Sequence, residues 1–141
     1  MKRFLLVLVT MLFLSQAFAE EYVVIVNVSN NDTNAKDHYL LKAPAWNNGA
    51  NVEPYEIDES GDLKKLLVKK AFLKQILGMS FNDYNKHWAD LKASGNTNRP
   101  TKLKTFSSIK RFVQRKKGGI GYVPRSQAGG DVKIVATFNV Q

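Results

Sequence analysis

The sequence YVVIV, residues 22–26, is a continuous apolar run of β-branched and aromatic residues. A strand whose two faces are both buried has this character, as in the centre of an α/β sheet. A polar cluster rich in Asn, Ser and Asp follows at residues 27–32 and ends the run. The segment therefore predicts an inner strand of a sheet that is covered on both sides.

Helical and extended patterns follow this strand. A short helix is expected over residues 37–42, before Pro44, and an extended segment over residues 51–57, which Pro54 confines to a sheet edge or a strand start. Longer helices are expected over residues 62–77, after the cap Ser80 and after the cap Thr105, and strands over residues 120–123 and 132–140. The first long helix has seven apolar positions expected to be buried: Leu63, Leu66, Leu67, Phe72, Leu73, Ile76 and Leu77.

This order of elements predicts one α/β domain with a small mixed sheet and helices packed on it. The chain has 141 residues, 44% of them apolar and 23% charged, which is a globular composition. It has no cysteine, which excludes a disulfide framework, a thiol nucleophile and a cysteine-based zinc site. The hydrophobic core must therefore provide the stability.

The first nineteen residues carry the three parts of a secretory signal peptide in order. Lys2 and Arg3 form a basic start, residues 4–14 are apolar except for Thr10, and residues 17–19 match a small-x-small cleavage site. The apolar run is short for a bilayer span and lacks a basic stop-transfer flank, so a membrane anchor is the less favoured alternative. Cleavage removes 19 of the 141 residues, leaves a domain of 122 residues over 20–141, and lowers the formal net charge from +9 to +7.

Catalytic patterns are missing from the sequence. The two histidines, His38 and His87, have no partner at metal-ligand spacing, and His87 is expected at the surface. Five carboxylates cluster before the lysine-rich helix, at Glu53, Glu56, Asp58, Glu59 and Asp62. A metal or acid–base pair there is one interpretation, and a solvated acidic loop is the favoured one. We therefore predict no catalytic residue, no metal ligand and no cofactor, and a protein that is not an enzyme.

The positive charge gathers on the helix over residues 62–77 and in the basic run at residues 115–117. The helix carries five lysines, Lys64, Lys65, Lys69, Lys70 and Lys74. Such a face can attract phosphate groups or an anionic membrane, and a solvated lysine face is the default interpretation. The aromatic residues fall on apolar stripes and do not interleave with the cations as a base-stacking platform would, so no nucleic acid partner is expected.

Two short segments resemble anion-binding loops. Ser60 and Gly61 precede the long helix, where a hydroxyl, free backbone N–H groups and the helix dipole suit an oxyanion. The same pair is also typical of an ordinary helix cap, which is the favoured interpretation of the local pattern. The glycine-rich stretch at residues 118–121 matches neither G-x-G-x-x-G nor a P-loop, and glycines also end helices.

Taken together, several short motifs follow one another in a fixed order along the chain. They are Trp46-x-x-Gly49 with Pro54, Lys69-x-x-Phe72, Tyr84-x-x-x-Trp88, Gly95 with Pro100, and Gly118-x-Ile120-Gly121-Tyr122-Val123, after the strand at residues 23–27 with Asn30. In this order and spacing the sequence resembles the substrate-binding proteins of phosphate ABC transporters, and in particular their short, truncated members. The resemblance covers nearly all of residues 20–141.

The resemblance implies a type 2 periplasmic-binding-protein fold, in which full-length members hold an anion between two α/β lobes. This chain is similar to mainly one lobe, and the phosphate loop of the opening segment is absent. An arginine and a Ser-Gly-Thr sequence in the family are replaced here by residues 59–62, Glu-Ser-Gly-Asp. Ser60 and Gly61 carry over as anion ligands, whereas Asp62 puts a negative charge in place of a hydroxyl donor.

The expected function is that of a periplasmic, non-enzymatic accessory or degenerate anion-binding domain linked to ABC-type phosphate uptake. Its expected ligand is inorganic phosphate or a similar oxyanion, and a homodimer or an envelope protein is the expected partner. The alternative is an interaction protein of the cell envelope that has lost its ligand and docks through the lysine-rich face.

Overall fold

The computed structural model of the protein describes residues 19–30, 34–96 and 99–141. The elements in chain order are β1 (Glu20–Val26), α2 (Ala35–Tyr39), β2 (Glu53–Ile57), α3 (Leu63–Phe72), the π-helix η2 (Leu73–Leu77), α4 (Phe81–Ala93), β3 (Thr101–Leu103), α5 (Phe106–Arg115), β4 (Gly119–Pro124), the short 3-10 helix η3 (Arg125–Gln127) and β5 (Lys133–Val140). The signal peptide expected at residues 1–19 lies outside the described residues except for Ala19. Across the described ranges, no helix has the length and apolar character needed to cross a membrane.

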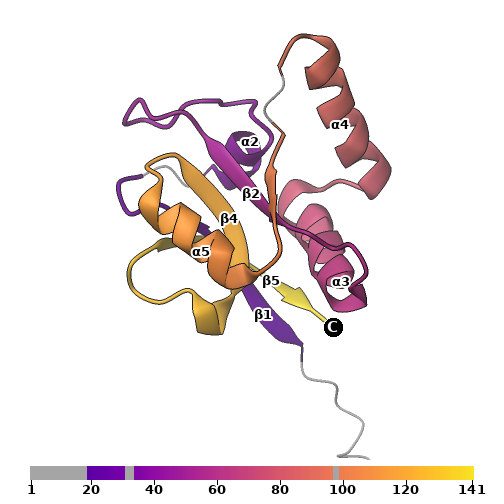
Figure 1. Ribbon diagram of the computed structural model, residues 1–141, viewed down its shortest axis with the longest axis vertical. Helices are drawn as coiled ribbons and strands as arrows, with labels where there is room; N and C mark the ends of the chain where they lie inside the picture. Colours follow the sequence, from indigo (N-terminus) through magenta and orange to yellow (C-terminus); the bar gives the residue numbers. More distant parts are fainter. Residues whose placement is uncertain (1–18, 31–33, 97–98) are drawn as a thin grey trace, which may run out of the picture.

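The five strands form one mixed sheet in the order β3-β2-β4-β1-β5 (Figure 1). β1 pairs antiparallel with β4 and β5, and β2 pairs parallel with β3 and β4. The β1 residues from Tyr22 to Val26 are buried. The predicted α/β class, with a small mixed sheet and an inner first strand, is therefore confirmed.

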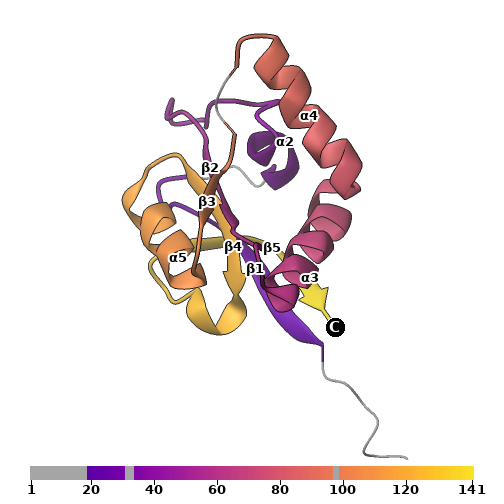
Figure 2. The ribbon, with the colours of Figure 1, turned by 45° about the vertical axis from the view of Figure 1, so that its right-hand side comes forward.

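Helices cover both faces of this sheet. A Cβ atom placed on Gly121 of β4 would lie 2.6 Å from Ile109 of α5, whereas the next residue, Tyr122, stacks on Phe72 of α3 at 4.2 Å between ring centroids. Successive side chains of a strand point to opposite faces. The helices α3 and α5 therefore lie on opposite sides of the sheet, as Figure 2 shows.

The helix boundaries follow from local capping. Ser80 and Thr105 accept backbone N–H groups at the starts of α4 and α5, as predicted. At the other end of the long helix, Gly78 takes the left-handed conformation with φ of +66° and turns the chain toward α4. Local sequence signals therefore place these helix ends correctly.

The buried face of the long helix differs from the predicted one. Leu63 and Leu67 are 70% and 40% exposed, whereas Lys69 is only 3% exposed. The buried residues of this helix are Val68, Lys69, Phe72, Leu73 and Leu77. A charged residue therefore occupies a core position, and two leucines are left on the outer surface.

The glycine-rich stretch at residues 118–121 serves close packing. A Cβ atom on Gly118 would lie 1.7 Å from the Asn51 carbonyl oxygen, and the carbonyl of Gly118 itself accepts hydrogen bonds from Trp46 Nε1 at 2.9 Å and Glu53 N at 2.8 Å. Only glycine has room between these backbones. These contacts explain the glycines without a phosphate group.

One strand escaped the sequence prediction. β3 is three residues long and pairs with β2, whose partner residues lie 46 positions earlier, as in the pair Tyr55 and Thr101. Pro54 is the second residue of an inner strand, since β2 begins at Glu53 and lies between β3 and β4. A strand start was one of the two positions that its missing N–H group allowed.

At the other edge of the sheet, β5 is in contact with the π-helix. The side-chain amide of Gln75 donates to the Asn139 carbonyl at 2.7 Å and accepts from the Asn139 N–H at 3.1 Å. A side chain thus pairs with one residue of the edge strand in the way that a neighbouring strand would.

Candidate functional site

The predicted anion ligands lie on an exposed turn between β2 and α3. The Ser60 N–H donates to Asp58 Oδ1 at 3.0 Å, and Gly61 has a φ of +71°, a left-handed conformation that suits glycine. Both residues are exposed. The structure therefore brings Ser60 and Gly61 to the start of α3, where the family resemblance places them.

Asp62 caps the helix that follows this turn. Its extended backbone, with φ of −132° and ψ of 106°, ends the turn, and its Oδ1 accepts the Lys65 N–H at 3.1 Å. A capping carboxylate satisfies an unpaired N–H of the first turn and interacts favourably with the helix dipole. The cap of α3 is thus Asp62, two residues after Ser60.

Asp58 holds the donors of Ser60. The hydroxyl and then the backbone N–H of Ser60, with smaller contributions from the charges of Lys102 and Lys104, hold the pKa of the Asp58 carboxyl below its usual value. The Ser60 N–H that would bind an oxyanion is therefore already paired with a carboxylate of the same turn, and the Ser60 hydroxyl lowers the pKa of that carboxyl.

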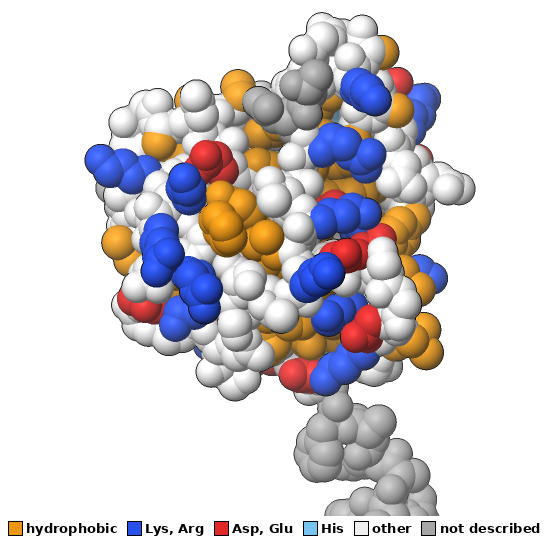
Figure 3. All heavy atoms as spheres, viewed as in Figure 1, with side chains coloured by type: hydrophobic (Ala, Val, Ile, Leu, Met, Phe, Trp, Pro, Cys, Tyr) orange, Lys and Arg blue, Asp and Glu red, His pale blue; other side chains and the backbone are white. Residues whose placement is uncertain are grey.

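Cations surround the turn. Lys65 lies 3.9 Å from Asp62 and donates to the Lys104 carbonyl at 2.6 Å, and Lys102 lies 3.9 Å from Glu59. Figure 3 shows Lys and Arg side chains in a column over the side of the molecule that holds α3 and β3, with carboxylates between them. The lysines give this region a positive potential, but the neighbouring carboxylates of the same chain offset part of it.

A buried ionic cluster lies beneath the turn. Lys69 Nζ is 3.4 Å from Glu56 Oε2 and 3.1 Å from Glu59 Oε2, and the side chains of Lys69 and Glu56 are 4% and 2% exposed. Tyr84 of α4 donates its hydroxyl to Glu56 Oε2 at 2.6 Å. These contacts tie β2, the turn, α3 and α4 together.

The protonation states of this cluster follow from its surroundings. Burial acts to raise the pKa of Glu59, but hydrogen bonds from its own backbone N–H and from Lys69, with the charges of Lys69 and Lys102, outweigh burial and lower that pKa. Burial and the Glu56 carboxylate raise the pKa of Tyr84 well above its usual value. The tyrosine therefore stays protonated as a donor.

The acidic cluster is thus divided in two, which corrects the expectation of a solvated loop. Glu56 is buried with Lys69, and Lys69 does not belong to the exposed lysine face. His87 is also not a free surface residue, since its Nε2 lies 2.7 Å from the Leu40 carbonyl oxygen. Among the described residues, no group of three His, Cys, Asp or Glu side chains is placed to hold a metal ion.

The motifs that carried the family resemblance hold the fold together. Trp46 donates to the Gly118 carbonyl and packs against His38, with 4.0 Å between the centroids of the two tilted rings. Lys69 and Tyr84 meet at Glu56, and Phe72 packs on Tyr122. In these contacts the motif residues stabilise the fold, and none of the contacts involves a ligand.

The sheet order and the helices on its two faces define an α/β domain with a periplasmic-binding-protein-like fold. A solved structure that is similar to it is the ABC-type phosphate transport receptor from Vibrio cholerae, with a TM-score of 0.58 and 9% sequence identity over 86% of this chain and 55% of that chain. The protein spans about half the length of that receptor, and at this identity the similarity concerns the fold. No family model matches the sequence, and no curated protein matches it significantly.

Proposed function

We propose that this protein is an exported, non-enzymatic binding domain in which the anion site of the phosphate-receptor fold is degenerate. The observation that carries the proposal is the pairing of the turn before α3: Asp58 accepts the Ser60 N–H, and Asp62 accepts the Lys65 N–H. An oxyanion at Ser60 and Gly61 would have to displace or face both carboxylates.

Electrostatics decides against strong phosphate binding at the native turn. Two unit negative charges about 4 Å apart repel by roughly 4 kcal/mol at an effective dielectric constant of about 20. The helix dipole stabilises an anion by only about 0.3–1 kcal/mol, and solvent exposure reduces both contributions. A single lobe also leaves one side of the anion in water. Tight binding would therefore need a second wall, from a second copy or from an envelope protein.

Phosphate titrations at constant ionic strength test this proposal. The native protein should bind weakly, and Asp62→Thr, which keeps a helix cap and removes a charge, should bind at least about tenfold more tightly, or roughly 1.4 kcal/mol. Asp58→Asn with Asp62→Thr should bind more tightly still, and Asp90→Asn on the exposed side of α4 is the charge control. Equal affinities in all four proteins would reduce the turn to a helix cap. Tight binding by the native monomer would contradict the degenerate site.

Export to the periplasm is part of the proposal and rests on the N-terminal sequence. The intact mass of the protein recovered from the cell envelope fraction should correspond to a chain that begins at Glu20. Recovery of the soluble protein with residues 1–19 still attached would contradict export by cleavage.

The second candidate function is ligand-free docking on an envelope partner through the outer face of α3. It is favoured by the exposure of Leu63 and Leu67, since apolar side chains in solvent beside lysines are typical of an interaction surface. In a calorimetric titration with phosphate, heats that do not reach saturation and that disappear when salt is added would support this function over anion binding.

A further inference from the structure

The other end of the long helix holds a crevice with a different chemistry. Leu63–Phe72 and Leu73–Leu77 form one rod, which ends at the left-handed residue Gly78. The Met79 N–H closes the rod by donating to the Leu73 carbonyl at 2.9 Å, and α4 starts at Phe81. The sharp turn between the two helices leaves a hollow of about 590 Å³ between them.

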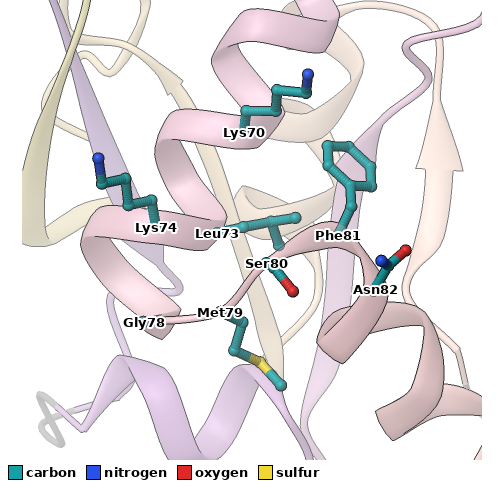
Figure 4. A pocket seen from close by; sticks show the side chains of 8 residues that line it. All are labelled: Lys70, Leu73, Lys74, Gly78, Met79, Ser80, Phe81 and Asn82. Carbon is teal, nitrogen blue, oxygen red and sulfur yellow. The ribbon is translucent and has the colours of Figure 1, made fainter.

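The floor of the crevice is apolar. Figure 4 shows Leu73 and Phe81 on the two walls, with Met79 at the turn between them. Leu73 is buried, and Met79 and Phe81 are half-buried. The volume lies within the range of small-molecule sites, which are lined mostly by hydrophobic side chains with a few polar groups.

The rim of the crevice is basic. Lys70 and Lys74 line it from α3 and the π-helix, and no carboxylate is among the lining residues. A Cβ atom on Gly78 would lie 4.0 Å from Lys36 Nζ, which brings a third ammonium group to this corner. Within the described part of the chain, none of these three lysines lies within ion-pair distance of a carboxylate.

This rim carries positive charge without a counter-charge among the described residues. Lys70 and Lys74 are both exposed and have no carboxylate of the described part of the chain within 4.0 Å. The other lysines of the same helix, Lys64, Lys65 and Lys69, each have a carboxylate within 4.0 Å. An anionic group at this rim would supply the counter-charge that no side chain lining the crevice supplies.

We propose that this crevice binds a small amphiphilic anion. Its acidic head is held at the basic rim by the ammonium group of Lys70 or of Lys74, which extend to different sides of the helix (Figure 4), and its apolar part lies against Leu73, Met79 and Phe81. The start of α4 is already capped by Ser80, so the lysines supply the positive charge. Such a ligand can be a free alkyl phosphate or the head and first methylene groups of an anionic membrane lipid.

Calorimetry with monomeric octyl phosphate, below its micelle concentration, tests the site. Octyl phosphate should bind at least about tenfold more tightly than inorganic phosphate because its chain buries apolar surface. Replacing both lysines, Lys70→Gln with Lys74→Gln, should weaken binding at least about fivefold, since each exposed charge pair contributes modestly. Lys86→Gln with Lys92→Gln, on the exposed face of α4, removes the same charge and should leave the affinity unchanged.

Further arms separate the sources of the ligand and the failure cases. Octyl trimethylammonium has the same chain and the opposite charge, and should not bind. Vesicle binding that depends on Lys70 and Lys74 while octyl phosphate fails would assign the site to membrane lipid. The proposal would be overturned if the two double variants bound octyl phosphate equally. It would also be overturned if the native protein bound neither octyl phosphate nor the vesicles. The outcome is independent of the turn at Ser60, because Asp62→Thr should leave octyl phosphate binding unchanged.

Discussion

The lysines of the long helix lie in two kinds of surroundings, with a carboxylate partner in one part of the helix and without one in the other. At the start, Lys64 and Lys65 are paired with carboxylates, and near the middle the buried Lys69 is paired with Glu56 and Glu59. At the end, Lys70 and Lys74 face an apolar crevice whose lining has no carboxylate. Negative charge is therefore built in at one end and left to a ligand at the other. The lysines of this protein therefore do not form one uniform basic surface.

The largest expected effect comes from replacing two adjacent lysines, of which one has carboxylate partners and the other has none. Lys69→Met should destabilise the protein by about 3–5 kcal/mol, because it leaves the buried carboxylate of Glu56 without its cation and removes one of the two cations beside Glu59. Lys70→Met, one residue further on the exposed side, should change stability by less than about 0.5 kcal/mol. Urea unfolding at pH 7 measures both. Similar losses in the two variants would refute the difference between the paired and the unpaired lysines.

The tyrosine of the buried cluster gives the next largest effect. Tyr84→Phe removes a hydrogen bond of 2.6 Å to a buried carboxylate and should cost about 2 kcal/mol in the free energy of unfolding. Tyr122→Phe removes a weaker interaction, in which the hydroxyl accepts from Ile57 N at 3.2 Å, and should cost less. The reverse ranking in urea unfolding would show that Glu56 does not depend on Tyr84.

A glycine in the left-handed conformation lies at each end of the long helix, so the same substitution can be compared at the two positions. Gly61→Ala and Gly78→Ala should each destabilise by about 1 kcal/mol, since alanine is strained at φ of +71° and +66° although both positions have room for a Cβ atom. Gly130→Ala, which has room and no positive φ, is the control. Thermal unfolding measures all three, and a neutral Gly78→Ala would argue against a fixed turn at the crevice.

The smallest effect is the response to acid. The folded-state pKa values of Asp58 and Glu59 are lowered from their ordinary values of 3.8 and 4.5. Their contribution to stability is therefore complete above about pH 4.5 and is lost as the pH falls through the lower folded values. Glu59→Gln should flatten this acid-side decline in urea unfolding from pH 5 to pH 3, relative to the native protein. An unchanged slope would mean that Glu59 is not held by Lys69.

Local signals in the sequence predicted much of the fold. The apolar run at residues 22–26, the caps Ser80 and Thr105, and the stop at Gly78 each depend on neighbouring residues, so they are visible without the fold. β3 was missed because its pairing partner lies far away in the chain. Three residues have too little periodicity to reveal a strand.

The buried charges could be read only in part. Lys69 is spaced three and four residues from Phe72 and Leu73, so it falls on their side of the helix, and this spacing was a signal for burial. The identity of its partners was not readable, because Glu56 and Tyr84 come from β2 and α4. The glycines at 118 and 121 resembled a phosphate loop, since close backbone approach and anion binding demand the same residue.

The pairing of Gln75 with Asn139 bears on the solubility of the folding chain. The β5 sequence KIVATFNV has one charged residue and no proline, a composition that favours joining another chain edge to edge. The Gln75 amide occupies the N–H and C=O groups that a joining strand would need at Asn139. This guard exists only after the π-helix has docked on the sheet. A chain in which the strands had formed without the π-helix in place would therefore expose this edge to another chain.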